Sequence, residues 1–244
     1  MHDADRPLIS PTTTTKLRRA VTPRVVLVPL RKHLQGYLAH LGVDRRRARN
    51  FGESRYYEPP TPGAAGVIGP FLGAPHAAVV AEEAVALGAK ELLFFGLAGA
   101  LDDSLRFGDL CLVESAHADE GVSPTYFPGE RDFAADPELL DRLKAHFEQC
   151  GLATQRQKVW TTGTLFYETP ARVATYREKG CSLVEMEISA LYAVARLRKV
   201  RAAAVVVVSD NVGSGRWRPG FMRPRYRRQL HRALGALASF GHHD

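Results

Sequence analysis

The sequence predicts an α/β protein in which a mixed central sheet is flanked by helices on both faces. Short runs that are apolar throughout, typical of strands covered on both sides, alternate with longer segments whose apolar residues recur at the helical period. The most apolar run is 202–208, which consists of alanine and valine alone. Strands and helices that alternate in this way build a sheet with helices on its two faces.

The first half of the chain begins with residues 1–22, where two prolines and four consecutive threonines predict a loosely held arm. A single domain over 23–244 is expected after it. The β-branched run 24–29 ends in proline and predicts the first strand, and the apolar period over 30–41 predicts a helix. Strands are expected again at 63–67 and 89–95, and a glycine and proline turn at 69–76 opens a helix through residue 87 between them.

The second half continues with expected strands at 107–113, 157–161 and 202–208. Asp136 stands before Pro137 and predicts the start of a helix that reaches about residue 149. A short buried strand should end at 183–184, after which the apolar residues recur at the helical period from 188 onward. The final helix is expected over 224–240.

The composition is that of a globular protein, with 45% hydrophobic and 24% charged residues. No apolar run approaches the roughly 20 residues that span a bilayer, so we expect no membrane contact. The amino-terminal residues lack the basic and then apolar layout of a secretory signal, which favours a cytoplasmic protein. Three widely spaced cysteines with no C-x-x-C pair are interpreted as reduced thiols, and no metal site is expected.

A net charge of +7 raises the question of nucleic-acid binding. The basic residues, however, are divided between 45–49 and 216–232, and no zinc-finger, helix-turn-helix or RNA-binding motif accompanies them. A solvated basic face, or one that attracts anionic small molecules, explains the charge more simply. We therefore expect no nucleic-acid partner.

Two carboxylates, Glu185 and Glu187, stand two positions apart where a buried strand gives way to a helix. In α/β sheets such junctions at the carboxyl ends of strands line the ligand crevice. Carboxylates are seldom buried without partners. The residues alone leave two interpretations open: a substrate-binding pair, or two charges in the first turn of a solvated helix, where the helix dipole favours them.

The segment Val184-Glu185-Met186-Glu187, followed by Ser189-Ala190-Leu191, resembles the signature of the nucleoside phosphorylase and nucleosidase family, which includes purine nucleoside and uridine phosphorylases. The resemblance implies that Glu187 accepts hydrogen bonds from the ribose hydroxyls and that Met186 packs on the sugar. Glu185 is a further candidate for substrate binding, although it could equally face solvent.

Other segments resemble the same family in the same order, so that the match covers most of 24–240. The stretch 96–100 resembles the loop that receives phosphate in phosphorylases, which implies phosphate contacts at Ala98 and Gly99. The stretch 161–169 resembles the loop whose aromatic side chain stacks on the base, which makes Phe166 the stacking candidate; the other interpretation of Phe166 is a core aromatic.

Asp210 follows the most apolar strand and resembles the aspartate that purine-specific members place at the base. Breaking an N-glycosidic bond leaves negative charge on the departing base. A carboxylic acid that gives a proton to a ring nitrogen relieves this charge, and such proton transfer contributes about 10²- to 10⁴-fold. The rival interpretation is a turn aspartate before Asn211 and Gly213. We favour the catalytic role for Asp210, together with Glu187, which would also stabilise the cationic sugar.

The nucleophile is where the sequence departs from the family. Phosphorylases place an arginine at the position of Phe94 and a hydroxyl residue at that of Leu97, and both are apolar here, which leaves Arg31 as the phosphate contact. Loss of charge-assisted hydrogen bonds, each worth roughly 1.5 to 3 kcal/mol, favours water over phosphate. The glutamate that activates water in nucleosidases is missing as well. The possible substitutes are His33, His76 and Glu120.

The sequence therefore predicts an enzyme that cleaves the N-glycosidic bond of a nucleoside, with a purine riboside and hydrolysis favoured. Two alternatives remain: a phosphorylase, with phosphate as co-substrate and arginines such as Arg49 or Arg55 supplied by a second subunit, and a nucleoside-binding module without turnover. No other cofactor is expected. Because family members assemble as dimers or hexamers, a homodimer or homohexamer is expected. A nucleotide substrate whose 5′-phosphate meets Arg216, Arg218 or Arg223 is a further option.

Overall fold

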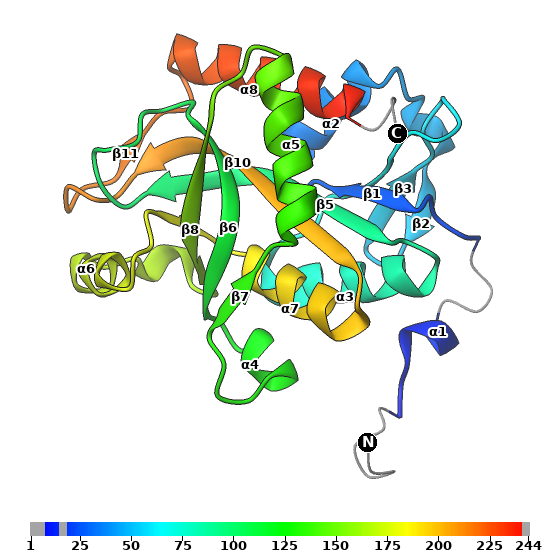
Figure 1. The fold of residues 1–244 in the computed structure, drawn as a ribbon, viewed down its shortest axis with the longest axis horizontal. Helices are drawn as coiled ribbons and strands as arrows, with labels where there is room; N and C mark the ends of the chain where they lie inside the picture. The colour runs from blue at the N-terminus through cyan, green and yellow to red at the C-terminus, as the bar shows by residue number, and fades with distance from the viewer. Residues whose placement is uncertain (1–7, 15–18, 241–244) are drawn as a thin grey trace.

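The computed structural model describes residues 8–14 and 19–240, and its centre is an eleven-stranded mixed sheet (Figure 1). Its strand order is β11-β10-β6-β8-β9-β5-β1-β4-β3-β2, with β7 paired to β6. β10 also pairs with β5, so β10, β6, β8, β9 and β5 form a closed ring of strands. The remaining strands extend from β5 as an open sheet.

The strands are β1 (Arg24–Leu27), β2 (Arg49–Phe51), β3 (Ser54–Tyr57), β4 (Gly66–Gly69), β5 (Glu91–Ala100), β6 (Leu110–Asp119), β7 (Asp132–Ala134), β8 (Thr154–Thr162), β9 (Leu183–Glu185), β10 (Arg201–Asn211) and β11 (Arg218–Pro219). The helices are α1 (Pro11–Thr14), α2 (Arg31–His40), α3 (Gly73–Ala86), α4 (Ser123–Tyr126), α5 (Pro137–Gln149), α6 (Pro170–Glu178), α7 (Ile188–Arg198) and α8 (Pro224–Ser239). In the described part of the chain there are also two short 3₁₀ turns, η2 (Arg45–Arg47) and η3 (Leu165–Tyr167).

The helices form two layers. α3 and α7 pack on one face of the sheet, and α2, α5 and α8 pack on the other (Figure 1). Successive residues of β10 face opposite layers: Val206 belongs to the core beneath α3 and α7, and Val207 to the core beneath α2 and α8. Burial on both faces explains why this strand is apolar at every position. The predicted fold class is confirmed.

The structure corrects the expected end of the third strand. β5 continues to Ala100, so the stretch 96–99 is strand and not a loop. At this end of β5 both edges of the strand pair with neighbouring strands, because Gly99 pairs with both Asp210 of β10 and Val184 of β9. Glycine and alanine carry little strand propensity of their own, and pairing on both sides supplies what the local sequence lacks.

The sequence predicts no strand or helix between the first helix and β4, but the structure has the antiparallel hairpin β2–β3 in this segment. This hairpin pairs with β4 at the edge of the open sheet. The helix α6 was also missed, although Thr169 caps it by accepting a hydrogen bond from the Arg172 backbone N–H at 3.3 Å. Of the predicted arm, part lies outside the described residues, and 11–14 form α1.

Among residues 8–14 and 19–240, no helix is both long enough and apolar enough to cross a bilayer. Cys111 and Cys181 are buried and Cys150 is exposed, and all three are free thiols. Glu91, at the opposite end of β5 from Gly99, is paired with Arg24, Arg142 and Arg201.

Candidate active site

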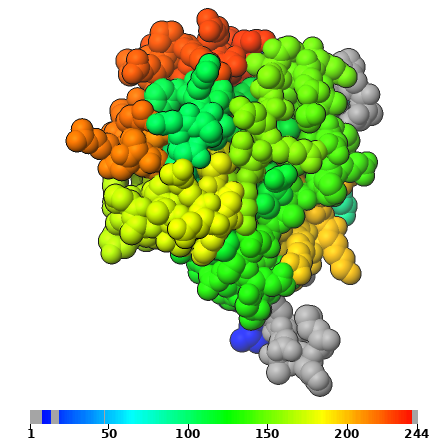
Figure 2. Space-filling view, turned by 60° about the vertical axis from the view of Figure 1, so that its left-hand side comes forward, coloured from blue at the N-terminus to red at the C-terminus, as the bar shows by residue number. Residues whose placement is uncertain are grey.

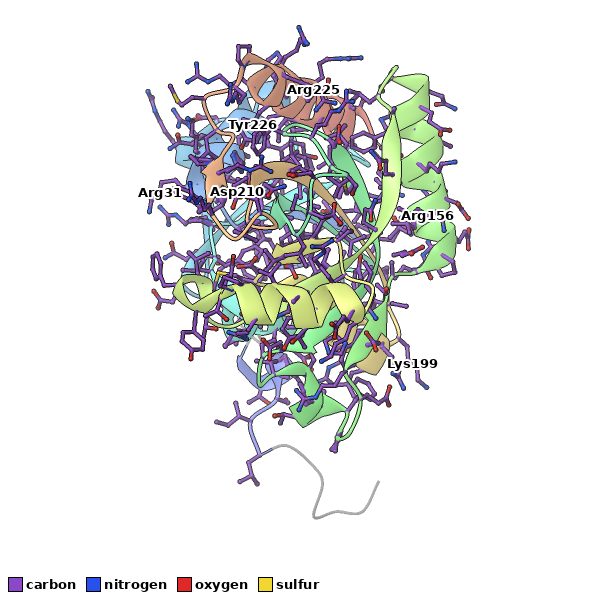
Figure 3. The ribbon with its side chains drawn as sticks, turned by 90° about the vertical axis from the view of Figure 1, so that its left-hand side faces the viewer. Arg31, Arg156, Lys199, Asp210, Arg225 and Tyr226 are labelled. Carbon is purple, nitrogen blue, oxygen red and sulfur yellow. The ribbon has the colours of Figure 1, made fainter. Side chains whose placement is uncertain are left out.

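The carboxyl ends of β10, β5 and β9 meet at one end of the strand ring. Gly99 stands between them, since its backbone pairs with Asp210 on one side and Val184 on the other. Met186 and Glu187 follow directly after β9. The topology thus brings Asp210 and the Glu185–Glu187 segment, which are far apart in the sequence, to the same end of β5. Figure 3 shows Asp210 on the face of the molecule that lies to the left in Figure 1.

Gly99 leaves room for the Asp210 side chain. A Cβ atom on Gly99 would lie 3.1 Å from Asp210 Oδ2 and 3.2 Å from Val184 Cγ1. Both contacts are tighter than ordinary van der Waals packing, so a side chain here would displace the carboxylate. Ala98 is buried, and its carbonyl accepts a hydrogen bond from Ser209 Oγ at 3.3 Å. Both residues that were assigned to phosphate therefore contact the aspartate segment.

Asp210 is half-buried and holds two hydrogen bonds. Ser209 Oγ donates to its Oδ1 at 2.6 Å, and Trp217 Nε1 donates to its Oδ2 at 3.0 Å. The register between β10 and β5 shifts between Val208 and Asp210, which is an irregularity of the kind that redirects a side chain next to a site. The carboxylate is therefore aimed by the strand and held by two donors.

Glu187 occupies the residue before α7 and is buried, with 6% of its surface exposed. The backbone N–H of Gly73, the first residue of α3, donates to Glu187 Oε1 at 2.7 Å. Burial raises the pKa of Glu187, and the backbone N–H groups around it oppose this rise. The alternative of a solvated first turn is wrong, because the carboxylate is enclosed between α3 and α7.

Glu185 is also buried, and it does not face solvent. Its Oε2 accepts hydrogen bonds from the backbone N–H groups of Glu187 at 2.6 Å and Ile188 at 2.7 Å, and the Thr161 hydroxyl donates to Oε1. Burial raises the pKa of Glu185, and the charge on Glu187 adds to the effect. The side chain thus satisfies orphan donors at the start of α7 and fixes the backbone that carries Glu187.

We predict that Glu185→Gln destabilises the protein. The amide can present only one oxygen to three donors, and each buried donor left unsatisfied costs about 1 to 3 kcal/mol. A loss of about 2 to 4 kcal/mol should lower the Tm by roughly 5 to 15 °C for a domain of this size. Thermal unfolding followed by circular dichroism measures it, with Glu178→Gln on the exposed side of α6 as control. A Tm equal to that of the control would contradict the structural role.

The stacking candidate Phe166 lies in the turn η3 and is fully exposed, with 100% of its surface accessible. The interpretation of Phe166 as a core aromatic is therefore wrong. Met186 is half-buried beside Glu187. Sequence reasoning missed Glu168, the residue after η3, whose charge interacts with that of Asp210. Burial, and secondarily Asp210, raise the pKa of Glu168 to about 7, while Arg172 opposes them. Recognising the Thr169–Pro170 helix start would have drawn attention to this carboxylate.

The expected phosphate positions remain apolar in the fold. Phe94 is buried against Phe71, with ring centroids 6.4 Å apart, and Leu97 packs against the core beneath α2 and α8. Arg31 begins α2 and lines a surface groove of about 390 Å³ between α2 and the β2–β3 hairpin. Arg45 and Arg55 line the same groove, together with Glu53. Three arginines of the same chain, Arg31, Arg45 and Arg55, therefore line one groove.

The candidates for water activation have other hydrogen-bond partners or a lowered basicity. Glu120 accepts hydrogen bonds from the Ser123 backbone N–H at 3.1 Å and from Ser189 Oγ at 3.0 Å. Burial and Lys32 lower the pKa of His33 to about 4, so this ring is a weak base toward water. His76 Nε2 lies 3.2 Å from Ser54 Oγ. Arg218, an option for a 5′-phosphate, forms an ion pair with Asp103.

No group of three or more histidine, cysteine, aspartate or glutamate side chains in the described part of the chain is arranged to hold a metal ion. The charged side chains at the end of the strand ring are instead the carboxylates described above. Their arrangement can bind a polyhydroxylated ring at Glu187 and a hydrogen-bonding heterocycle at Asp210.

The fold is shared with solved purine nucleoside phosphorylases and nucleosidases. The purine nucleoside phosphorylase of Toxoplasma gondii superposes with a TM-score of 0.76 and 19% identity over 89% of this chain and 91% of its own. The AMP nucleosidase of Bacteroides thetaiotaomicron gives a TM-score of 0.71 and 21% identity over 89% and 87%. The chain belongs to the phosphorylase superfamily, whose family model matches residues 24–239.

Among curated relatives, the DeoD-type purine nucleoside phosphorylase of Streptococcus pyogenes serotype M5 is 30% identical over 149 residues, which are 60% of this chain and 62% of that protein. The match thus spans less than two thirds of this relative. The family membership predicted from the glutamate signature is confirmed.

Proposed function

We propose that the protein cleaves the N-glycosidic bond of a nucleoside, most effectively a purine riboside, with water as the attacking group. The observation that carries the proposal is the convergence of Asp210 and Glu187 at the end of β5, with Gly99 between the two strands that deliver them. Asp210 would interact with the departing base, and Glu187 would interact with the sugar. N-glycosidic cleavage requires both interactions.

The sugar becomes cationic as the bond breaks, and Glu187 would orient the ribose hydroxyls and stabilise this charge. Its burial between α3 and α7 strengthens both effects, because a charge interacts more strongly where water is excluded. Met186, half-buried and adjacent, would pack on the sugar. The Gly73 N–H holds Glu187 Oε1, so the carboxylate is oriented before the substrate arrives.

Water is favoured because Phe94 and Leu97 bring no donor to the place where a phosphate would bind. Phosphorolysis is the second candidate, and two observations favour it. The curated relative from Streptococcus pyogenes is named a purine nucleoside phosphorylase, and Arg31 shares its groove with Arg45 and Arg55. In this alternative an arginine cluster would replace the missing donors. A homodimer or homohexamer, predicted from the family resemblance, would bring further arginines within reach.

The test incubates the purified protein with inosine, adenosine and uridine, with and without phosphate, and follows base and sugar by chromatography. Hydrolysis predicts free ribose at equal rates in both buffers. Ribose 1-phosphate formed only with phosphate would establish the alternative, and the double variant Arg31→Ala/Arg55→Ala should then raise the KM for phosphate. Saturable nucleoside binding without product would indicate a binding module and contradict both.

A further inference from the structure

Exposed aromatic side chains gather around Asp210. In the described part of the chain twelve large hydrophobic side chains are exposed, and six of them come from two short segments, 165–167 and 217–222. All four exposed phenylalanine, tyrosine and tryptophan side chains are among these six: Phe166, Tyr167, Trp217 and Phe221. Single exposed apolar residues are common on proteins, but a concentrated group marks an interaction site.

The two segments lie on the same side of the molecule. In Figures 1 and 3 the turn between β10 and β11 lies next to the segment that contains η3 and α6, and Figure 2 shows both on one face. Both segments interact with Asp210. Trp217 donates a hydrogen bond to the Asp210 carboxylate, and the charge of Glu168, two residues beyond Phe166, interacts with the charge of Asp210.

Trp217 is both anchored and exposed. Its Nε1 donates to Asp210 Oδ2 at 3.0 Å, yet 63% of its surface remains accessible. The next residue, Arg218, begins β11 and pairs with Asn211 of β10, so the backbone beside the tryptophan is tied to the sheet. Phe221 contacts the indole, with ring centroids 6.5 Å apart. A large flat ring is thus held beside Asp210 with much of its surface accessible.

We propose that Trp217 is a base-recognition residue: its ring stacks on the purine of the substrate, and its N–H occupies Asp210 until the base replaces it. The proposal rests on the proposed function, because it places the base at Asp210. Aromatic faces stack on any base. An indole N–H can only donate a hydrogen bond, so Trp217 pairs with an ionised Asp210 oxygen. Once the Asp210 carboxyl carries the proton that it gives to the base, a purine ring nitrogen that accepts this proton takes the place of the indole.

The chain contains two tryptophans, which allows a direct readout. Trp160 is fully buried and stacked on Tyr176, with ring centroids 4.1 Å apart, so a ligand on the surface should leave its emission unchanged. We expect inosine and adenosine, mixed rapidly with the protein, to change the emission saturably. The same titration of Trp217→Phe should show no change, and the control Leu197→Ala, an exposed apolar residue near the end of α7, should respond like the wild type.

Kinetics separate stacking from simple support of Asp210. Trp217→Ala removes the ring and should raise the KM for purine ribosides about 10-fold or more, in line with the loss of one base stack. Trp217→Phe keeps a ring without the N–H, and its KM should stay within about 3-fold of the wild type, as expected if stacking dominates. Equal losses in the two variants, or a wild-type KM in Trp217→Ala, would overturn the proposal.

Failure of the proposed cleavage activity can be distinguished from failure of the proposed role of Trp217. An emission change in wild type without any product would support Trp217 as a base contact and contradict cleavage. Product formation with no emission change in any nucleoside titration would support cleavage and overturn the role of Trp217. Absence of both would overturn both.

Discussion

Glu187→Gln is expected to lower kcat/KM for purine ribosides by about 10²-fold, while 2′-deoxyribosides should lose about 10-fold or less. Each hydrogen bond from a sugar hydroxyl to a charged carboxylate is worth roughly 1.5 to 3 kcal/mol, and only a riboside offers both the 2′- and the 3′-hydroxyl. The glutamine oxygen can still accept from the Gly73 N–H, so the loop before α3 should keep its position. Steady-state rates on inosine and 2′-deoxyinosine measure the difference.

The control for Glu187→Gln is a Tm measurement on the same variant. Because one amide oxygen can still accept the hydrogen bond that the Gly73 N–H donates to Glu187, an amide should be tolerated at this position, and the Tm should not fall as it does for Glu185→Gln. The two variants would then differ in their effect: Glu187→Gln would lower activity, and Glu185→Gln would lower stability. Equal losses on ribosides and 2′-deoxyribosides would remove Glu187 from ribose recognition.

Asp210→Asn is expected to reduce kcat for purine ribosides by about 10²- to 10³-fold, with the KM changed by less than about 3-fold. An amide cannot deliver a proton to the departing base, and general acid catalysis contributes about 10²- to 10⁴-fold. The asparagine oxygen can still accept from Trp217 or Ser209, so the geometry of the site is largely kept. Rates on inosine and adenosine at substrate saturation report the chemical step.

A neighbouring aspartate supplies the matched control. Asp103 pairs with Arg218 at the same end of the molecule, and 70% of its side-chain surface is exposed. Asp103→Asn should retain turnover close to that of the wild type, because exposed ion pairs contribute little. Unchanged turnover in Asp210→Asn would assign the proton transfer elsewhere, and Glu168, whose charge interacts with that of Asp210, would be the first residue to test.

The fold class could be predicted because a strand that is buried on both faces is apolar at every position. The run at 202–208 is apolar throughout since its residues point alternately into two cores, and the signature at 184–187 indicated the family. Elements that are stabilised by pairing with distant strands could not be predicted from such a pattern. β5 beyond residue 95 depends on β9 and β10, and the β2–β3 hairpin depends on the edge of β4.

The layered α/β architecture, the family and the candidate carboxylates could be predicted from the amino-acid sequence, because periodicity and motif are local properties of the chain. The role of each carboxylate became visible in the folded chain. Glu185 turns inward to the donors of α7 and Glu187 lies between two helices, although they are two residues apart. Trp217 and Glu168 joined the site only through the strand ring that brings their segments to Asp210. Burial and hydrogen-bond partners depend on contacts between distant segments, and a side chain takes its role from them.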